Sequence, residues 1–120
     1  MRINAEDPER HFFPCPGTVT DVSWPRGAGV RVESHLFPGY RIPAYYDSLV
    51  AKLVIHGEDR AQALSRAVAA LADLRIAGIT TTQSLHQWLL HDARLQAGDF
   101  TTTALEHWLA ERTAAAAQEV

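Results

Sequence analysis

The chain has 120 residues, enough for one domain, and its 47% hydrophobic and 21% charged side chains are typical of a globular protein. Eleven basic and 14 acidic side chains give a formal net charge of −3, which excludes the basic surface of a nucleic-acid-binding domain and a polybasic membrane signal. The single cysteine excludes an internal disulfide and a cysteine metal cluster, and no apolar run approaches the roughly 20 residues of a membrane span.

The first half of the chain is predicted to form strands and turns. Residues 1–57 hold all six prolines and five of the seven glycines, with short apolar runs between them. The runs predict strands over 18–24, 30–37 and 49–56. The last is apolar almost throughout, so we expect it to be buried on both faces. The first residues have no apolar segment of the kind that signal peptides carry.

The second half is predicted to be helical. Asp59 is a plausible N-cap for a helix that runs up to Gly78, and Thr81 or Thr82 could cap a second helix. A third helix is expected from about Thr103. The fold class is therefore α+β, a small antiparallel sheet from the N-terminal half packed with helices from the C-terminal half.

Few residues carry an obvious chemistry of their own. Six histidines are scattered along the chain, and His86 and His91, five residues apart, do not share a helix face as paired metal ligands would. We therefore expect surface histidines rather than a zinc site. Cys15 lies between two prolines, and no basic run near it would lower the pKa of its thiol, so an inert turn residue is favoured over a reactive one.

Two local patterns are less ordinary. Arg31, Glu33 and His35 alternate with less polar residues and would share one face of a strand. This row could form an interface or an ion-pair ladder, but periodicity alone favours a solvated face. Asp47 follows the aromatic pair Tyr45-Tyr46 at the entry to the apolar strand. It could be a turn former, or a partly desolvated carboxylate that needs a cationic partner, and both alternatives stay open.

Several motifs in fixed order resemble the C-terminal domain of biotin carboxylase. The resemblance extends from Arg2 to about Leu109, and its N-terminal motifs are most similar to the biotin carboxylase subunit of acetyl-CoA carboxylase. The motifs are Arg-Ile-Asn-Ala-Glu-Asp-Pro at 2–8, Gly-Val-Arg-Val-Glu-Ser-His at 29–35, Gly-Tyr-Arg-Ile-Pro at 39–43, Tyr-Tyr-Asp-Ser-Leu-Val-Ala-Lys-Leu at 45–53 and Ile-Ala-Gly-Ile at 76–79.

The resemblance implies an ATP-dependent ligase that uses bicarbonate to carboxylate biotin on a carrier protein. It implies that residues 1–120 form one C-terminal domain, that ATP and Mg²⁺ are bound mainly by domains upstream of it, and that the chain alone is inactive. The implied partners are a biotin carboxyl carrier protein or domain, a carboxyltransferase and a second copy of the enzyme in a possible homodimer, with no nucleic acid or membrane. A cytoplasmic place in fatty acid biosynthesis is expected, although related carboxylases with other acceptors share the domain.

The resemblance also assigns roles to particular residues. Arg2 matches the arginine that stabilises the enolate of biotin, and a guanidinium suits that role because it stays charged. Asp47 matches an aspartate near the biotin pocket, and Arg31 matches an arginine of the subunit interface. Ala28 stands where a bacterial homodimer carries an aromatic interface residue, and Thr103 stands where some members have a histidine near the nucleotide.

A second hypothesis from a different class remains. The chain could be a stand-alone interaction or dimerisation module that keeps the sheet and the surface around Arg31 but performs no catalysis. The presence or absence of an ATP-binding domain encoded in frame upstream of Met1 separates the two hypotheses.

Overall fold

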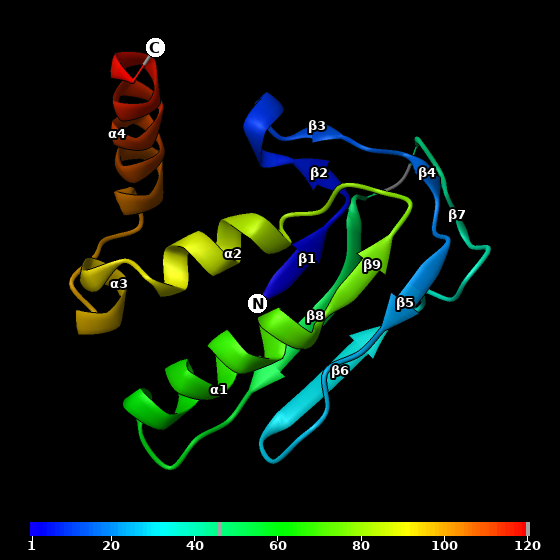
Figure 1. The fold of residues 1–120 in the computed structure, drawn as a ribbon, viewed down its shortest axis with the longest axis horizontal. Helices are drawn as coiled ribbons and strands as arrows, with labels where there is room; N and C mark the ends of the chain where they lie inside the picture. Colours follow the sequence, from blue (N-terminus) through cyan, green and yellow to red (C-terminus); the bar gives the residue numbers. More distant parts are fainter. Residues whose placement is uncertain (46, 120) are drawn as a thin grey trace.

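The computed structural model describes residues 1–45 and 47–119 (Figure 1). The strands are β1 Arg2–Asn4, β2 Glu6–Asp7, β3 Phe13–Pro14, β4 Gly17–Thr18, β5 Asp21–Ser23, β6 Val30–Ser34, β7 Arg41–Ile42, β8 Leu49–Ile55 and β9 Arg75–Ala77. The helices are α1 Arg60–Asp73, α2 Gln83–Leu90, α3 Ala93–Ala97 and α4 Ala104–Gln118, with a short 3₁₀ helix, η1, at Pro8–Arg10. The predicted α+β class is confirmed. Within the described residues, no helix is long and apolar enough to cross a membrane.

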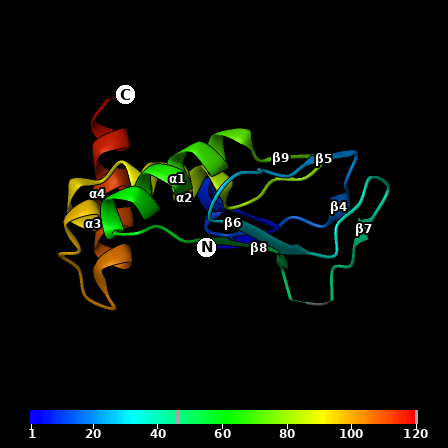
Figure 2. The same ribbon diagram turned by 90° about the horizontal axis from the view of Figure 1, so that it is seen from below.

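A three-stranded antiparallel sheet, in the order β1-β8-β6, forms the centre of the fold. One face of this sheet carries Ile3 and Leu53, both fully buried, and helix α1 contacts β8 and contributes the fully buried Leu71 to the same core. The other strands form antiparallel pairs, β2 with β3, β4 with β7 and β5 with β9. Figure 2 shows α3 and α4 at one end of the molecule and β4 and β7 at the opposite end.

The strand predictions hold in outline and fail in detail. The predicted strand 18–24 is split into β4 and β5, because Val19 between them turns fully into the core and its N–H donates to the carbonyl of Tyr40 at 2.8 Å. Strand β8 was expected to be buried on both faces, and this is wrong. Lys52 and Val54 are exposed, since only one side of β8 is covered by the helix.

Helix α1 begins as predicted and ends earlier. Asp59 is its N-cap, and the carboxylate accepts the N–H of Gln62 at 2.8 Å. The helix stops before Leu74, and the next three residues form β9, paired with β5, where the sequence predicted helix up to Gly78. Gly78 then adopts a φ of +96°, and a Cβ there would collide with the carbonyl oxygen of Thr18. A glycine is therefore needed where β9 leaves the sheet.

The remaining helices pack beyond the sheet. Helix α2 follows Thr82 and α4 follows Thr103, as predicted, whereas the short α3 between them was not expected. Arg94 joins α3 to α4, because its guanidinium lies 2.9 Å from both Asp92 and Glu111 and stacks 4.5 Å from the centre of the Trp108 ring. Hydrogen bonds from Arg94 lower the pKa of the Asp92 carboxyl from 3.8 to about 2.

Candidate functional site

The central sheet has one face without a covering helix, and this face carries the predicted functional residues. Arg2 on β1 lies opposite Lys52 on β8, and Lys52 lies opposite Glu33 on β6. Directly opposed residues of antiparallel strands project from the same side of a sheet. Arg31, opposite Val54, belongs to the same side, and all five side chains are exposed. We call this surface the open face.

Arg2 and Asp47 meet at the edge of the open face. Nη2 of Arg2 lies 4.0 Å from Oδ2 of Asp47, and the two side chains are 63% and 74% exposed. The expected cationic partner of Asp47 is therefore present, although the carboxylate is not desolvated as one alternative required. An ion pair this exposed contributes at most about 1 kcal/mol, so it orients the guanidinium only weakly by itself.

The Asp47 segment is held in place by its own hydrogen bonds. Oδ1 of Asp47 accepts the N–H of Leu49 at 2.9 Å, which is the turn-forming role that the sequence also allowed. The carbonyl of Ser48 accepts the N–H of Ala5 at 2.8 Å, and its hydroxyl donates to Glu6 at 2.7 Å. One carboxylate oxygen of Asp47 is thus fixed to the backbone while the other faces Arg2. The neighbouring Tyr46 lies outside the described residues.

The predicted polar row occupies the other side of the open face. Arg31 and Glu33 form an ion pair of 3.4 Å between side chains that are 69% and 52% exposed. His35 lies beyond the end of β6, and its ring packs edge-on against Tyr40 with centroids 5.1 Å apart. A shallow depression of about 470 Å³ extends from this row to Asp47. Its lining includes Glu33, Ser34, His35, Asp47 and Lys52. The row is a solvated strand face, and its role as a subunit interface stays a prediction.

Arg2 is fixed from the side of β1 that does not pair with β8. Oγ1 of Thr82, at the start of α2, accepts the N–H of Asn4 at 3.0 Å, and the N–H of Thr82 donates to the carbonyl of Asn4 at 3.0 Å. One turn later, Nε2 of His86 lies 2.8 Å from the carbonyl oxygen of Arg2. A strand carrying Arg2 was not predicted, since a single arginine near a chain end is usually a disordered surface residue.

The surroundings of His86 change its protonation. Burial lowers the pKa of the imidazole below its ordinary value of 6.5. The hydrogen bond with the Arg2 carbonyl acts in the opposite direction. His86 is therefore neutral at pH 7. A carbonyl oxygen can only accept, so Nε2 carries the hydrogen and donates it to Arg2.

Four residues that contribute to this site were missed at the sequence level: Glu6, Ser48, Thr82 and His86. Thr81 or Thr82 was expected to cap α2. Thr82 is the N-cap, yet its hydroxyl makes no capping bond to that helix and binds Asn4 of β1 instead, while Oγ1 of Thr81 accepts the N–H of Gln83 at 3.3 Å. His86 was expected to be a scattered surface residue. The only signal for Glu6 and Ser48 was that both lie inside the motifs that also contain Arg2 and Asp47.

The other candidate positions lie elsewhere. Ala28 is exposed in the turn between β5 and β6. Thr103 is exposed just before α4, and its hydroxyl lies 3.2 Å from that of Thr101. The Cys15 thiol is half-buried and contacts the carbonyl of Phe13 at 3.8 Å. Within residues 1–45 and 47–119, no three His, Cys, Asp or Glu side chains gather closely enough to hold a metal ion.

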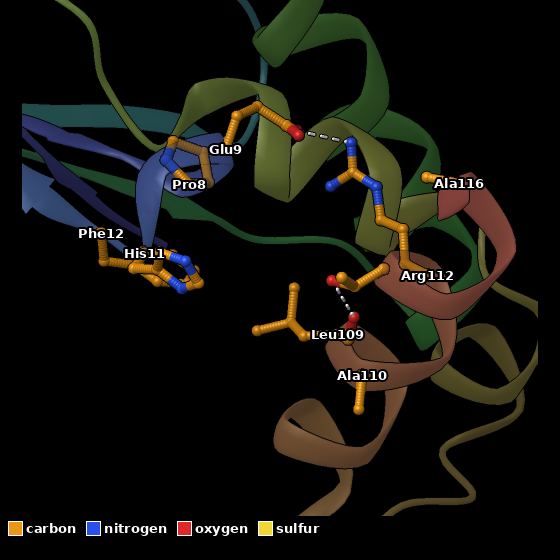
Figure 3. A pocket seen from close by; sticks show the side chains of 9 residues that line it. Pro8, Glu9, His11, Phe12, Leu109, Ala110, Arg112 and Ala116 are labelled. Carbon is orange, nitrogen blue, oxygen red and sulfur yellow. Dashed lines mark hydrogen bonds and ion pairs between the residues drawn. The ribbon is translucent and has the colours of Figure 1, made fainter. Parts of the chain in front are cut away.

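A hollow of about 570 Å³ lies between η1 and α4, and neither Arg2 nor Asp47 lines it. Figure 3 shows Glu9 and Arg112 on its two sides, joined by an ion pair of 2.8 Å. Arg112 also lies 5.1 Å from the centre of the Trp88 ring. The ion pair thus links α4 to η1 across the groove.

Comparisons with known proteins agree with the motifs. Residues 1–107 match the family model of the biotin carboxylase C-terminal domain. The chain is 48% identical over 105 residues to the biotin carboxylase of Pseudomonas aeruginosa, and the match covers 88% of this chain and 23% of that protein. It is 45% identical over 105 residues to biotin carboxylase 1 of Bacillus subtilis, with the same coverage of both chains.

A solved structure agrees as well. The biotin carboxylase domain dimer of the 2-oxoglutarate carboxylase from Hydrogenobacter thermophilus, in complex with MgADP and bicarbonate, superposes with a TM-score of 0.86 at 42% identity. The match covers 88% of this chain and 23% of that one. The chain thus spans less than a quarter of the length of each of these proteins.

Proposed function

Because this chain belongs to the biotin carboxylase C-terminal domain family, we propose that it acts as part of an ATP-dependent ligase that carboxylates carrier-bound biotin with bicarbonate. The observation that supports this most directly is the Arg2–Asp47 pair on the open face, at the two motif positions that the family resemblance assigns to the biotin pocket. The chain spans less than a quarter of its relatives. The proposal therefore includes that residues 1–120 are inactive by themselves.

In this proposal Arg2 stabilises the negative charge that develops on biotin when its proton is removed. A guanidinium is charged at every working pH and can donate two parallel hydrogen bonds to an oxyanion. Asp47 orients it, because its Oδ1 is held by Leu49 and its Oδ2 faces Arg2. Covering of the open face by the rest of the enzyme would remove water from the pair and strengthen it.

The proposed cofactors are bound mainly outside this chain. Among the described residues, no three His, Cys, Asp or Glu side chains could hold a metal ion together. By the family resemblance, Thr103 stands where some members have a histidine near the nucleotide. These residues therefore do not fit a complete ATP and Mg²⁺ site. We assign both to upstream nucleotide-binding domains, and biotin arrives on its carrier protein or domain.

The proposed partners follow from the same assignment. Arg31 would lie in the interface of a homodimer, and a carboxyltransferase would use the carboxylated carrier. An acetyl-CoA carboxylase of the cytoplasm, working in fatty acid biosynthesis, is our first choice because of the N-terminal motifs. A 2-oxoglutarate or pyruvate carboxylase would use the same domain.

The test is a bicarbonate-dependent phosphate-release assay on the assembled carboxylase, with this chain joined to its upstream nucleotide-binding domains. The assembled enzyme should carboxylate biotin, the purified 120-residue chain should not, and Arg2→Ala should abolish most of the activity. Lys52→Ala, on the same open face, is the matched control. An assembled enzyme that folds, binds the carrier and never carboxylates biotin would favour the non-catalytic interaction module.

A further inference from the structure

Strand β1 lies at the edge of the central sheet, and its outer side is occupied by the start of α2. Thr82 is only 4% exposed and exchanges two hydrogen bonds with Asn4, one from its backbone and one through its hydroxyl. Its Oγ1 also lies 3.5 Å from the carbonyl of Arg2. Thr82 thus substitutes for the neighbouring strand that an edge strand lacks.

His86 continues this contact by one helical turn. Positions four residues apart lie on the same side of a helix, so Thr82 and His86 both face β1. The imidazole Nε2 donates to the carbonyl of Arg2 at 2.8 Å. On the other side of β1, Arg2 lies opposite Lys52 in the register with β8. The backbone of Arg2 is therefore held between β8 and α2.

We propose that Thr82 and His86 are positioning residues for Arg2, and this inference rests on the proposed role of Arg2 in biotin carboxylation. The ion pair with Asp47 is exposed at both ends and 4.0 Å long, so it leaves the guanidinium considerable freedom. Holding the Cα of Arg2 still limits the region that its side chain can reach. A catalytic group displaced by about 1 Å can lose up to 100-fold in rate, so a fixed backbone matters at this position.

His86 can be tested with a matched set of variants in the assembled carboxylase. His86→Leu removes the donor and should lower kcat for biotin carboxylation by about three- to tenfold, with a smaller change in KM, because geometry rather than affinity is lost. His86→Gln keeps an N–H donor of similar reach and should restore most of the rate. The control is His91→Leu, since His91 also bonds a backbone carbonyl, that of Gln87 at 2.8 Å, at the other end of α2.

Thr82 provides a second, independent measurement on the 120-residue chain itself. Thr82→Val keeps the shape and removes the acceptor of the Asn4 N–H, so hydrogen exchange of the Asn4 amide should accelerate at least tenfold. Thr82→Ser should keep that amide protected. The amide of Val19 serves as an internal reference, because Val19 is fully buried and its N–H donates to the carbonyl of Tyr40 at 2.8 Å, away from β1 and α2. Equal acceleration of both amides would overturn a local role for Thr82.

Two further arms separate this inference from the proposed function. If Arg2→Ala leaves carboxylation unchanged, the role of Arg2 is wrong. If Arg2→Ala abolishes carboxylation while His86→Leu matches wild type, the role of Arg2 stands and the positioning inference is overturned. If the inference is correct, His86→Leu costs nothing more in an Arg2→Ala background, since residues that act through one another are not additive.

Discussion

The hydroxyl of Ser48 donates to Oε2 of Glu6 at 2.7 Å, across 42 residues of sequence. Oε1 of the same carboxylate accepts from the side-chain amide of Asn4 at 3.2 Å. Glu6 thereby connects the strand that carries Arg2 to the segment that carries Asp47. The two residues of the ion pair are placed by a third residue that contacts neither of them through its carboxylate.

Ser48→Ala should therefore lower the free energy of unfolding of the chain. A hydrogen bond to a charged acceptor contributes about 1.5–3 kcal/mol, and this one is partly buried, so a loss of about 1–2 kcal/mol is expected. Urea unfolding followed by circular dichroism measures it. Ser65→Ala, at an exposed position of α1, is the control and should be neutral or slightly stabilising. Equal stability of the two variants would mean that the Glu6–Ser48 bond contributes nothing.

The Arg2–Asp47 pair predicts non-additive kinetics in the assembled carboxylase. Arg2→Ala should lower biotin carboxylation by about 10²–10³-fold, as the loss of a single oxyanion donor does. Asp47→Ala should cost less, because a misoriented arginine keeps its charge. The double variant should be little worse than Arg2→Ala alone. Losses in ln(kcat/KM) that add in full would show that the two residues act independently.

Arg31 predicts an effect on self-association. Arg31→Glu places a second carboxylate beside Glu33, and two copies meeting at this face would then desolvate like charges together. Sedimentation velocity of the assembled enzyme across a dilution series should show a weakened dimer. Arg10→Glu makes the same charge change at an exposed position in η1 and should leave the dimer intact. Identical mass distributions for both variants would place the interface elsewhere.

The half-buried His86 predicts loss of stability in mild acid. Its folded-state pKa lies below the unfolded value of 6.5, so between these two values the unfolded chain binds more protons than the folded one. The free energy of unfolding should be unaffected by this group above about pH 7.5 and should fall as the pH drops through 6.5. His86→Gln should flatten this part of the profile.

Thermal unfolding of both proteins at steps from about pH 7.5 to pH 5 tests this prediction, since the difference in Tm between them should depend on pH. Ser84→Ala, at an exposed and non-titrating position of the same helix, should run parallel to wild type. Parallel curves for His86→Gln and wild type would show that His86 titrates equally in the folded and unfolded chains.

Local patterns predicted what local interactions determine. Asp59 was identified as an N-cap because a carboxylate before a helical repeat is sufficient to define one. Strand β9 was missed because its residues continue the apolar spacing of α1, and only pairing with β5, more than fifty residues earlier, makes them extended. Tertiary pairing thus overrode the helical pattern.

The same contrast between local patterns and long-range contacts applies to the candidate site. The motif resemblance named Arg2, Asp47 and Arg31, and the structure places Arg2 and Arg31 on one sheet face, with Asp47 beside Arg2 at its edge. Thr82 and His86 could not be found from spacing, because their hydrogen bonds to β1 span about eighty residues. No periodicity relates residues at that separation.

The position of Arg2 also has a consequence for the order of folding. Its strand gains its partners only when β8, about fifty residues later, and the start of α2, about eighty residues later, are in place. Contacts between residues so far apart in sequence carry a large loop-closure cost and tend to form late. During synthesis the residues around Arg2 leave the ribosome long before Thr82 and His86 exist. A nascent chain interrupted within α1 would already contain the local signals for its helix and hairpin. Arg2 would still lack its contacts with Thr82 and His86.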